Sequence, residues 1–283
     1  MAALPTSVTS RAVVVVTWLN LIAQIGIVGT GGLVRLTASG LGCPTWPKCT
    51  EDSLITTPEM GIHGVIEFGN RLLTFVLAAI GIWAVILFWK NVQRKFAVTI
   101  FLGVVAQALL GGVTVLTGLN SWIVGAHYLV SAVLIWIAAK FVWSFYNPVV
   151  SPAGGFSRVI AWLIAVFGTL SIIAGVIVTG AGPHAGDADT PRNGLPLDLW
   201  QHFHSWPGYI TLGLVALQLF LVRSNGTLIR WNVALFVALA IQALVGVLQS
   251  RLGVPAELVT IHILGSTILI ALFSAQHSAV RKA

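Results

Sequence analysis

Eight long apolar segments constrain what this chain of 283 residues can fold into. Each contains about 20 mostly apolar residues, which is the length of helix that crosses roughly 30 Å of hydrocarbon. Because lipid offers no hydrogen-bond partner to a backbone N–H or C=O group, such segments must satisfy their own backbone as helices. The sequence therefore predicts an all-α integral membrane protein with eight transmembrane helices. The segments lie at about 12–33, 61–89, 96–116, 122–146, 159–180, 198–222, 231–250 and 256–278.

The distribution of charge predicts how these helices are oriented. Only 8% of the residues are charged and the mean hydropathy is +0.94, so few side chains carry the net charge of +7. Basic residues gather on one side of the eight-helix arrangement, and the acidic residues lie on the other side or just inside it. This positive-inside pattern places both termini in the cytoplasm. We expect the positive charge to set orientation in the lipid bilayer, and we expect no nucleic-acid partner.

An internal repeat relates the two halves of the chain. Residues 107–135 align without a gap to residues 242–270, with 11 identities in 29 positions, and His127 aligns with His262. Further upstream, GIVGTG at 26–31 resembles GVIVTG at 175–180. Four helices per half give both halves the same orientation, so an axis along the membrane normal should relate them. We expect two pseudo-symmetric four-helix bundles at 1–148 and 149–283, with an outer loop at 34–60.

Two histidines of the second half predict a haem site. His204 and His262 each lie about six residues into a helix, roughly 9 Å below the outer surface at 1.5 Å per residue. Histidines at matching depth on facing helices can bind the two faces of one haem iron. The repeat places Asn70 opposite His204, because Asn70 precedes His127 by 57 residues and His204 precedes His262 by 58. The first half therefore contains a second, incomplete pocket.

Several polar residues surround this incomplete pocket. His127 either binds a metal there or hydrogen-bonds a neighbouring helix. Glu67 and Arg71, four residues apart in the outer third of the membrane, either form an ion pair or serve function separately. In the second case Glu67 accepts a proton or stabilises a cationic substrate, and Arg71 binds a propionate. His63, one turn before Glu67, is a propionate contact, an alternative iron ligand or a surface histidine.

The only cysteines are Cys43 and Cys49, in the segment GLGCPTWPKC of the first outer loop. The outer side of a bacterial inner membrane is oxidising, so this pair can form a disulfide. One interpretation is a disulfide that staples the loop. The other is an exposed pair that exchanges with external thiols and passes electrons.

Taken together, these motifs resemble the haem A synthase family. The resemblance rests on GGLVRLTASGLGCPTWPKC, on IEFGNRLLTF and on the paired AHYLVS and IHILGS, and it covers essentially the whole chain. The short loops and the cysteine pair resemble actinobacterial members. The resemblance implies a bacterial inner-membrane protein in which His204 and His262 hold a haem b cofactor. It also implies that the first half binds the substrate haem O, with Glu67 as the catalytic carboxylate and His127 as the ligand of the substrate iron.

One position departs from the family pattern. Many members carry Glu-x-x-His-Arg in the second helix, whereas this chain has Asn70 between Glu67 and Arg71. An amide is a poor iron ligand, so we expect the substrate haem to be held by His127 alone, or by His127 and His63. An open iron position would ease the exchange of substrate.

The resemblance implies that the C8 methyl of haem O is oxidised through successive hydroxylations to a formyl group, which gives haem A for terminal oxidases. It further implies a haem O synthase, a prenyltransferase, as the donor of substrate and a separate electron acceptor, and it leaves a homo-oligomer open.

The main alternative is a di-haem b-type quinone electron-transfer protein, which would need a second complete histidine pair. A haem transporter would show broken helices near the midplane. A thiol-redox protein would not need the intramembrane histidines.

Overall fold

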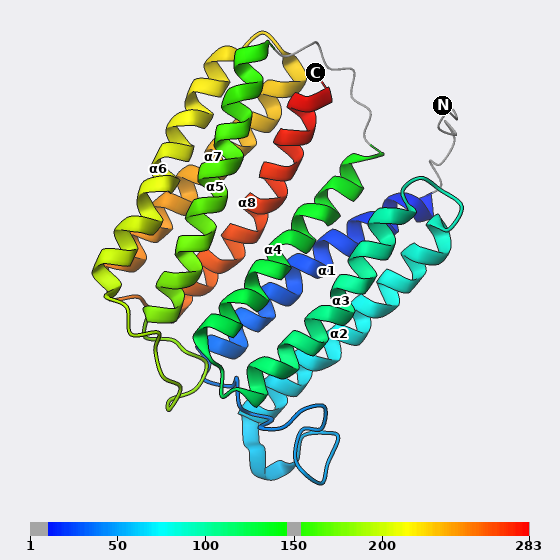
Figure 1. Cartoon of the computed structure of the whole chain (residues 1–283), viewed down its shortest axis with the longest axis vertical. Helices are drawn as coiled ribbons and strands as arrows, with labels where there is room; N and C mark the ends of the chain where they lie inside the picture. Colours follow the sequence, from blue (N-terminus) through cyan, green and yellow to red (C-terminus); the bar gives the residue numbers. More distant parts are fainter. Residues whose placement is uncertain (1–10, 146–153, 283) are drawn as a thin grey trace.

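Long helices joined by short loops make up the computed structural model, which describes residues 11–145 and 154–282 (Figure 1). A single 3-10 turn, η1 (Pro58–Met60), precedes the second helix. The expected boundary at residue 148 and the expected end of the fourth segment at 146 lie outside the described residues. The helices are α1 (Arg11–Leu36), α2 (Gly61–Phe88), α3 (Arg94–Leu116), α4 (Ser121–Trp143), α5 (Gly155–Ala181), α6 (Leu197–Leu221), α7 (Gly226–Arg251) and α8 (Ala256–Lys282).

Side-chain caps explain where two of these helices begin. The helix α7 begins at Gly226, five residues before the apolar segment, because the side chain of Asn225 accepts a hydrogen bond from the backbone N–H of Leu228 at 3.1 Å. Asn120 caps α4 in the same way. Hydropathy alone does not register such caps, so it places helix ends several residues away from where the backbone hydrogen bonds begin.

Seven helices in the described part of the chain are long and apolar enough to cross a membrane. The exception is α6, which has 25 residues but carries Asp198, Gln201, His202 and His204 in its first turns. A multi-pass, all-helical membrane protein is therefore confirmed, and α6 as the eighth span stays a prediction. The polar half of α6 is the half that holds the candidate ligand His204.

The helices lie in two groups, α1 to α4 and α5 to α8, side by side in Figure 1. Both α1 and α4 pack against α8, and α4 also packs against α5. The boundary between the groups therefore runs along α4 and α8, which are the helices that carry His127 and His262.

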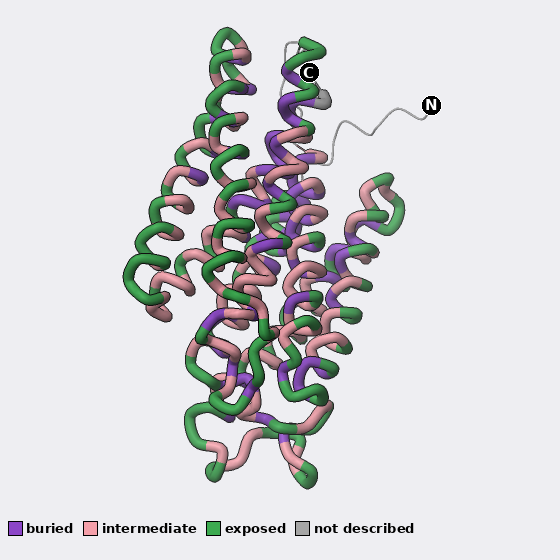
Figure 2. Tube along the Cα trace, turned by 60° about the vertical axis from the view of Figure 1, so that its left-hand side comes forward, coloured by how far each residue is buried: buried purple, intermediate pink, exposed green. Residues whose placement is uncertain are grey.

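Buried apolar side chains concentrate in the half of the molecule nearest the described chain ends (Figure 2). Among the largest fully buried side chains are Phe88 at the end of α2, Ile100 near the start of α3 and Phe141 near the end of α4. Lipid is as apolar as these side chains, so their association rests on close packing rather than on removal from water. The opposite half, which carries His127, His204 and His262, contributes little to these clusters.

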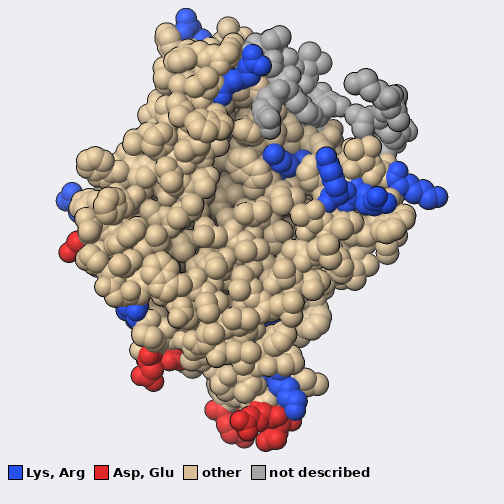
Figure 3. Space-filling view, in the orientation of Figure 1, with Lys and Arg blue, Asp and Glu red and all other residues tan. Residues whose placement is uncertain are grey.

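The charged side chains confirm the distribution expected from the sequence. Figure 3 shows Lys and Arg mainly at the end where α1 begins and α8 ends, and Asp and Glu towards the opposite end, where the loop after α1 projects. We call this second end the outer end. The candidate site residues described below lie in the outer half of the helices.

Candidate functional site

The loop between α1 and α2 folds back over the outer end of the first helix group. Cys43 and Cys49 form a disulfide within this loop, with their Cα atoms 4.4 Å apart, and both residues are 0% exposed. The ring of Trp46 lies so close to Gly112 of α3 that no Cβ would fit there. The expected disulfide is thus confirmed. Because both sulfur atoms are covered, the structure favours the stapling role over exchange with external thiols.

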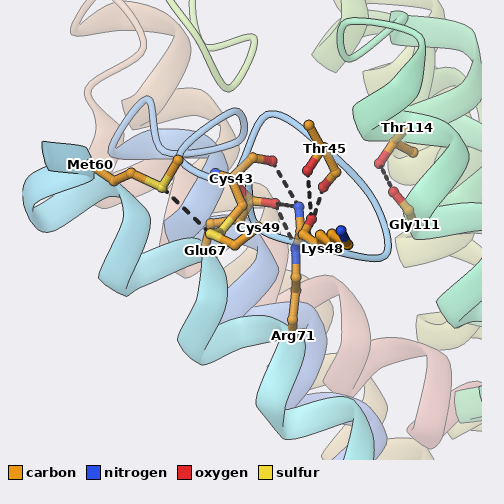
Figure 4. A network of polar contacts seen from close by, with 9 residues as sticks. All are labelled: Cys43, Thr45, Lys48, Cys49, Met60, Glu67, Arg71, Gly111 and Thr114. Atoms are coloured by element: carbon orange, nitrogen blue, oxygen red, sulfur yellow. Dashed lines mark hydrogen bonds and ion pairs between the residues drawn. A yellow bond between two sulfur atoms is a disulfide. The ribbon is translucent and has the colours of Figure 1, made fainter. Parts of the chain in front are cut away.

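Glu67 and Arg71 of α2 hold this loop in place (Figure 4). Nη2 of Arg71 lies 2.5 Å from Oε1 of Glu67, and the backbone N–H of Cys43 donates to Oε2 of Glu67. The remaining guanidinium donors bind loop carbonyls 2.8 to 3.1 Å away, those of Cys43, Thr45 and Lys48. Together with the Nε bond to Glu67, these contacts use all five N–H donors of Arg71.

This arrangement bears on the roles expected for the pair. Glu67 is only 5% exposed, and its charge is balanced by the guanidinium and by one backbone N–H group. The i,i+4 ion pair is therefore present. The propionate contact of Arg71 gains no support, because the loop already occupies its donors. Oε2 of Glu67 has a single donor and keeps acceptor capacity for a further proton or cation.

His127 lies on α4 against α3, where Gly111 leaves room for its ring. A Cβ at Gly111 would lie 3.4 Å from Cε1 of His127, and Gln107 of α3 donates to the His127 carbonyl at 2.9 Å. Nδ1 of His127 is buried without a hydrogen-bond partner among the described residues. The structure thus gives no support to a hydrogen bond from this ring to a neighbouring helix, and a buried polar atom without a partner is costly.

His204 and His262 face each other across α6 and α8. Their ring centroids are 5.9 Å apart, with the ring planes inclined at 79°. When two imidazoles bind one metal from opposite sides, their ring centres lie about 6 Å apart. This distance is the sum of two metal–nitrogen bonds of about 2 Å and of the short distance from each nitrogen to the centre of its ring. The observed spacing therefore fits one metal between the rings. This is the only candidate ligand pair that sequence reasoning proposed and the structure brings to such a distance.

Local contacts orient both rings. Nδ1 of His204 donates to the carbonyl of Ser171 at 2.8 Å, which leaves Nε2 unprotonated and available to a metal. A Cβ at Gly175 would lie 2.9 Å from Cε1 of His204, and one at Gly246 would lie 3.1 Å from Cε1 of His262. Small residues are thus required behind each ring. Nδ1 of His262 is buried and has no partner in the described part of the chain.

His63 and Asn70 occupy different surroundings on α2. His63 is exposed at the outer end, and its Nδ1 is hydrogen-bonded to Oγ of Ser39 at 2.9 Å. This favours the surface interpretation over an iron ligand. Asn70 lies two turns deeper, where its Oδ1 accepts a hydrogen bond from Thr30 of α1 at 2.7 Å.

Sequence reasoning missed Arg35, at the outer end of α1. Its Nε donates to the carbonyl of His184 at 2.5 Å and its Nη2 to the carbonyl of Thr179 at 2.7 Å. Among the described residues no Asp or Glu forms an ion pair with it. Arg35 thereby joins the first helix group to α5 and its outer loop. The sequence did contain a signal for Arg35, namely its position. An arginine at the outer end of an apolar helix departs from the positive-inside pattern.

The fold and these residues define a class of protein: a multi-pass helical membrane protein in which two histidine rings lie 5.9 Å apart between α6 and α8. Residues 14–199 match the model of the COX15-CtaA family, described as cytochrome oxidase assembly protein. This match covers more than half of the chain, and the chain belongs to that family.

Individual relatives extend the likeness to most of the chain. It is 29% identical over 291 residues to the Heme A synthase of Staphylococcus epidermidis strain RP62A, which covers 91% of this chain and 93% of that protein. The Heme A synthase of S. epidermidis strain ATCC 12228 is 27% identical over 284 residues with the same coverage. The Heme A synthase of Bacillus pumilus is 34% identical over 127 residues, which span only 39% of that relative. The family resemblance drawn from the sequence motifs is confirmed.

Proposed function

We propose that this chain is a haem A synthase, a membrane enzyme that oxidises the C8 methyl of haem O to the formyl group of haem A. The activity is supported by family membership and by the likeness to the S. epidermidis proteins along nearly the whole chain. One observation of the structure supports it most: the spacing of 5.9 Å between the rings of His204 and His262. A helix bundle with such a pair can hold a haem as its own cofactor.

In the second helix group, His204 and His262 would hold the iron of haem b through their Nε2 atoms. When bound, haem b supplies a one-electron carrier inside the membrane. Ser171 fixes the ring of His204, and Gly175 and Gly246 leave space behind the two rings.

Arg35 is the candidate anchor for a propionate of this haem b. Two of its nitrogens bind carbonyls, whereas Nη1 has no hydrogen bond to a described residue. Its partner Thr179 lies on α5 one turn beyond Gly175, the residue behind the ring of His204. A partly buried guanidinium without a carboxylate partner favours an anionic ligand, and Arg binds carboxylates well.

In the first helix group, His127 would bind the iron of the substrate haem O, and Glu67 would act on the methyl group that is oxidised. Removal of electrons from the methyl carbon by the separate acceptor creates positive charge there, water would supply the oxygen atom, and protons are released. The Glu67 carboxylate can stabilise that charge, and Oε2, which has one donor, can accept the proton. Arg71 and the Cys43 N–H hold the carboxylate in one orientation, and the disulfide loop covers it from the outer side.

The finer topology also belongs to this proposal. Both termini would lie in the cytoplasm and the disulfide loop on the oxidising side of a bacterial plasma membrane, as the charge distribution favours. The two helix groups would be pseudo-symmetric halves, with α6 as the eighth span. A prenyltransferase that makes haem O would supply the substrate, and a separate acceptor would take the electrons.

The test is to purify the protein in detergent from cells that make haem O and to identify the extracted haems by mass. We expect haem b together with haem O or haem A, and we expect Glu67→Ala to lose haem A while it keeps haem b. His63→Ala, a change at the exposed histidine of the same helix, is the matched control and should keep both. Two equivalents of haem b without haem A, unaffected by Glu67→Ala, would instead support the di-haem electron carrier.

A further inference from the structure

The two histidines of the second helix group are held in unequal ways. Nδ1 of His204 lies 2.8 Å from the carbonyl oxygen of Ser171. A carbonyl oxygen only accepts hydrogen bonds, so Nδ1 of His204 carries the proton and donates it. Nδ1 of His262 is buried and has no hydrogen-bond partner among the described residues. A hydrogen bond to Nδ1 therefore fixes one of the two rings and not the other.

Ser171 of α5 binds His204 of α6 twice. Besides accepting the bond from the ring, it donates its Oγ to the backbone carbonyl of His204 at 3.0 Å. A Cβ at Gly208, one turn after His204, would lie 3.4 Å from this Oγ, so the two helices pack closely here. Both the ring and the backbone of His204 are thus fixed relative to α5.

His262 of α8 is held to its neighbouring helix through the backbone instead. Gln242 of α7 donates to the carbonyl of His262 at 2.8 Å, and Gln107 of α3 donates to the carbonyl of His127 at 2.9 Å. These bonds fix the helix but make no contact with the Nδ1 atoms. Nδ1 of His127 also lacks a partner in the described part of the chain. The absence recurs at both aligned histidines, so it is a shared feature of α4 and α8.

We propose that His204 is the anchoring ligand of haem b, and that His262 is the weaker ligand, whose bond to iron breaks first. A hydrogen bond from Nδ1 to a carbonyl oxygen raises the basicity of the other ring nitrogen and holds the ring in place. Loss of such a partner costs about tenfold to a hundredfold in metal affinity. Ser171 is then a positioning residue that acts through His204. The inference rests on the proposed function, because it requires that these two histidines bind haem b.

The test compares His204→Gly with His262→Gly in the full-length protein. Both are made in a His127→Ala background, which removes the candidate ligand of the first group, and haem b is titrated into the purified protein in detergent. We expect His204→Gly to bind haem b about tenfold to a hundredfold more weakly than His262→Gly. In His262→Gly the haem should be five-coordinate and high-spin, and added imidazole should restore the low-spin spectrum. His202→Gly, a change at the exposed neighbour on α6, is the matched control and should keep low-spin haem b at unchanged affinity.

A second measurement keeps the test decisive if one glycine variant folds poorly. Resonance Raman spectra of the reduced variants report the stretching frequency of the bond between iron and the remaining imidazole. This frequency depends on the strength of the bond in the molecules that hold haem, and not on how many do. We expect a higher frequency in His262→Gly, where His204 is the remaining ligand, than in His204→Gly.

The outcomes separate the inference from the proposed function. If the two variants bind haem b with equal affinity and show equal stretching frequencies, the ligands are equivalent, the inference is wrong and the haem site stands. Weaker binding in His262→Gly than in His204→Gly also overturns the inference. If neither variant changes the affinity or the spectrum of haem b, the pair is not the ligand set, and the proposed haem site and this inference fail together.

Discussion

The two helix groups carry the same histidine helix but differ in the helix that faces it. His127 and His262 occur in aligned segments, and each accepts a hydrogen bond at its backbone carbonyl from a glutamine, at 2.9 Å from Gln107 and at 2.8 Å from Gln242. The repeat aligns His204 of the second group with Asn70 of the first, and the ring of His204 lies 5.9 Å from that of His262. Two imidazoles hold an iron firmly, whereas one leaves a face open. In the proposed function, this difference would let one architecture hold a resident cofactor in the second group and an exchangeable substrate in the first.

A second difference lies at the outer ends of the two groups. The first group is covered by a disulfide loop, which Arg71 and Glu67 hold through the carbonyls and one N–H group of its backbone. The second group's outer loop is held by Arg35 of α1 and by a hydrogen bond from His184 to the carbonyl of Val254 at 2.9 Å. The stapled cover is on the side proposed to carry out the chemistry, where exclusion of water and a fixed carboxylate matter most.

The largest effect should come from removing either imidazole of the pair His204 and His262. In His262→Ala or His204→Ala we expect the low-spin haem b signal and the formation of haem A to be lost together, because an axial ligand is gone and no other described side chain lies across from the remaining ring. Absorption and electron paramagnetic resonance spectra measure the first loss, and haem extraction measures the second. His202→Ala, at an exposed neighbour on α6, is the control. Retained haem b in both alanine variants would show that the pair at 5.9 Å is not the ligand set.

The next largest effect should come from the carboxylate of Glu67 in the first helix group. Glu67→Gln should lower the rate of haem A formation by about a hundredfold to ten-thousandfold, the usual contribution of a positioned acid or base. Haem b should remain, because Glu67 has no contact with His204 or His262. Rates measured in membranes that supply haem O test this.

Arg71→Gln separates chemistry from support for the loop. It removes the ion-pair partner but keeps the carboxylate, and breaking a buried pair costs about 3–5 kcal/mol of stability. We therefore expect a lower thermal midpoint in detergent with a smaller loss of rate than in Glu67→Gln. Equal loss of rate in the two variants, with equal loss of stability, would assign Glu67 a role in holding the loop only.

A smaller effect is expected from the disulfide. The disulfide closes a short loop, because the two cysteines are only 6 residues apart in the sequence. The double change Cys43→Ser with Cys49→Ser should therefore lower the free energy of unfolding by about 2 kcal/mol. Both haems should remain and haem A should still form more slowly, because the ion pair continues to hold the loop. Thermal unfolding and haem analysis measure this. Complete loss of turnover without loss of stability would instead restore the electron-transfer role of the cysteines.

The sequence predicted the helices and the proximity of His204 to His262, because both follow from patterns along the chain. Their role as haem ligands stays a prediction. Apolar length predicts helices in lipid, and the repeat carries His127 onto His262. The five bonds of Arg71 were beyond such patterns, since they depend on how the backbone of the loop folds. Arg35 was overlooked because an arginine near a helix end ordinarily lies in water or lipid headgroups.

The smallest effect, and the one that most directly probes how the two groups are joined, concerns Tyr128. This residue follows His127 on α4, and its hydroxyl is hydrogen-bonded to Oγ of Ser266 at 2.6 Å, one turn after His262 on α8. This polar contact links the two histidine helices near their histidines, and a second one, from Ser274 Oγ of α8 to the carbonyl of Trp136 of α4 at 2.9 Å, lies deeper. Hydrogen bonds between membrane helices contribute about 0.6 kcal/mol on average, so Tyr128→Phe should keep both haems and lower stability only slightly.

The sharper readout for Tyr128→Phe is the rate of electron transfer between the two haems after flash reduction in the loaded protein. If the contact fixes the relative position of α4 and α8, this rate should fall severalfold while the spectra of the separate haems stay unchanged. Ser266→Ala should reproduce the fall, and Ser278→Ala, a change at a serine on α8 that bonds only its own helix, should not. An unchanged rate in Tyr128→Phe would show that the remaining contacts between α4 and α8 set the distance: the hydrogen bond from Ser274 to Trp136 and the apolar packing at Ile135 and Ile270, which share one buried cluster.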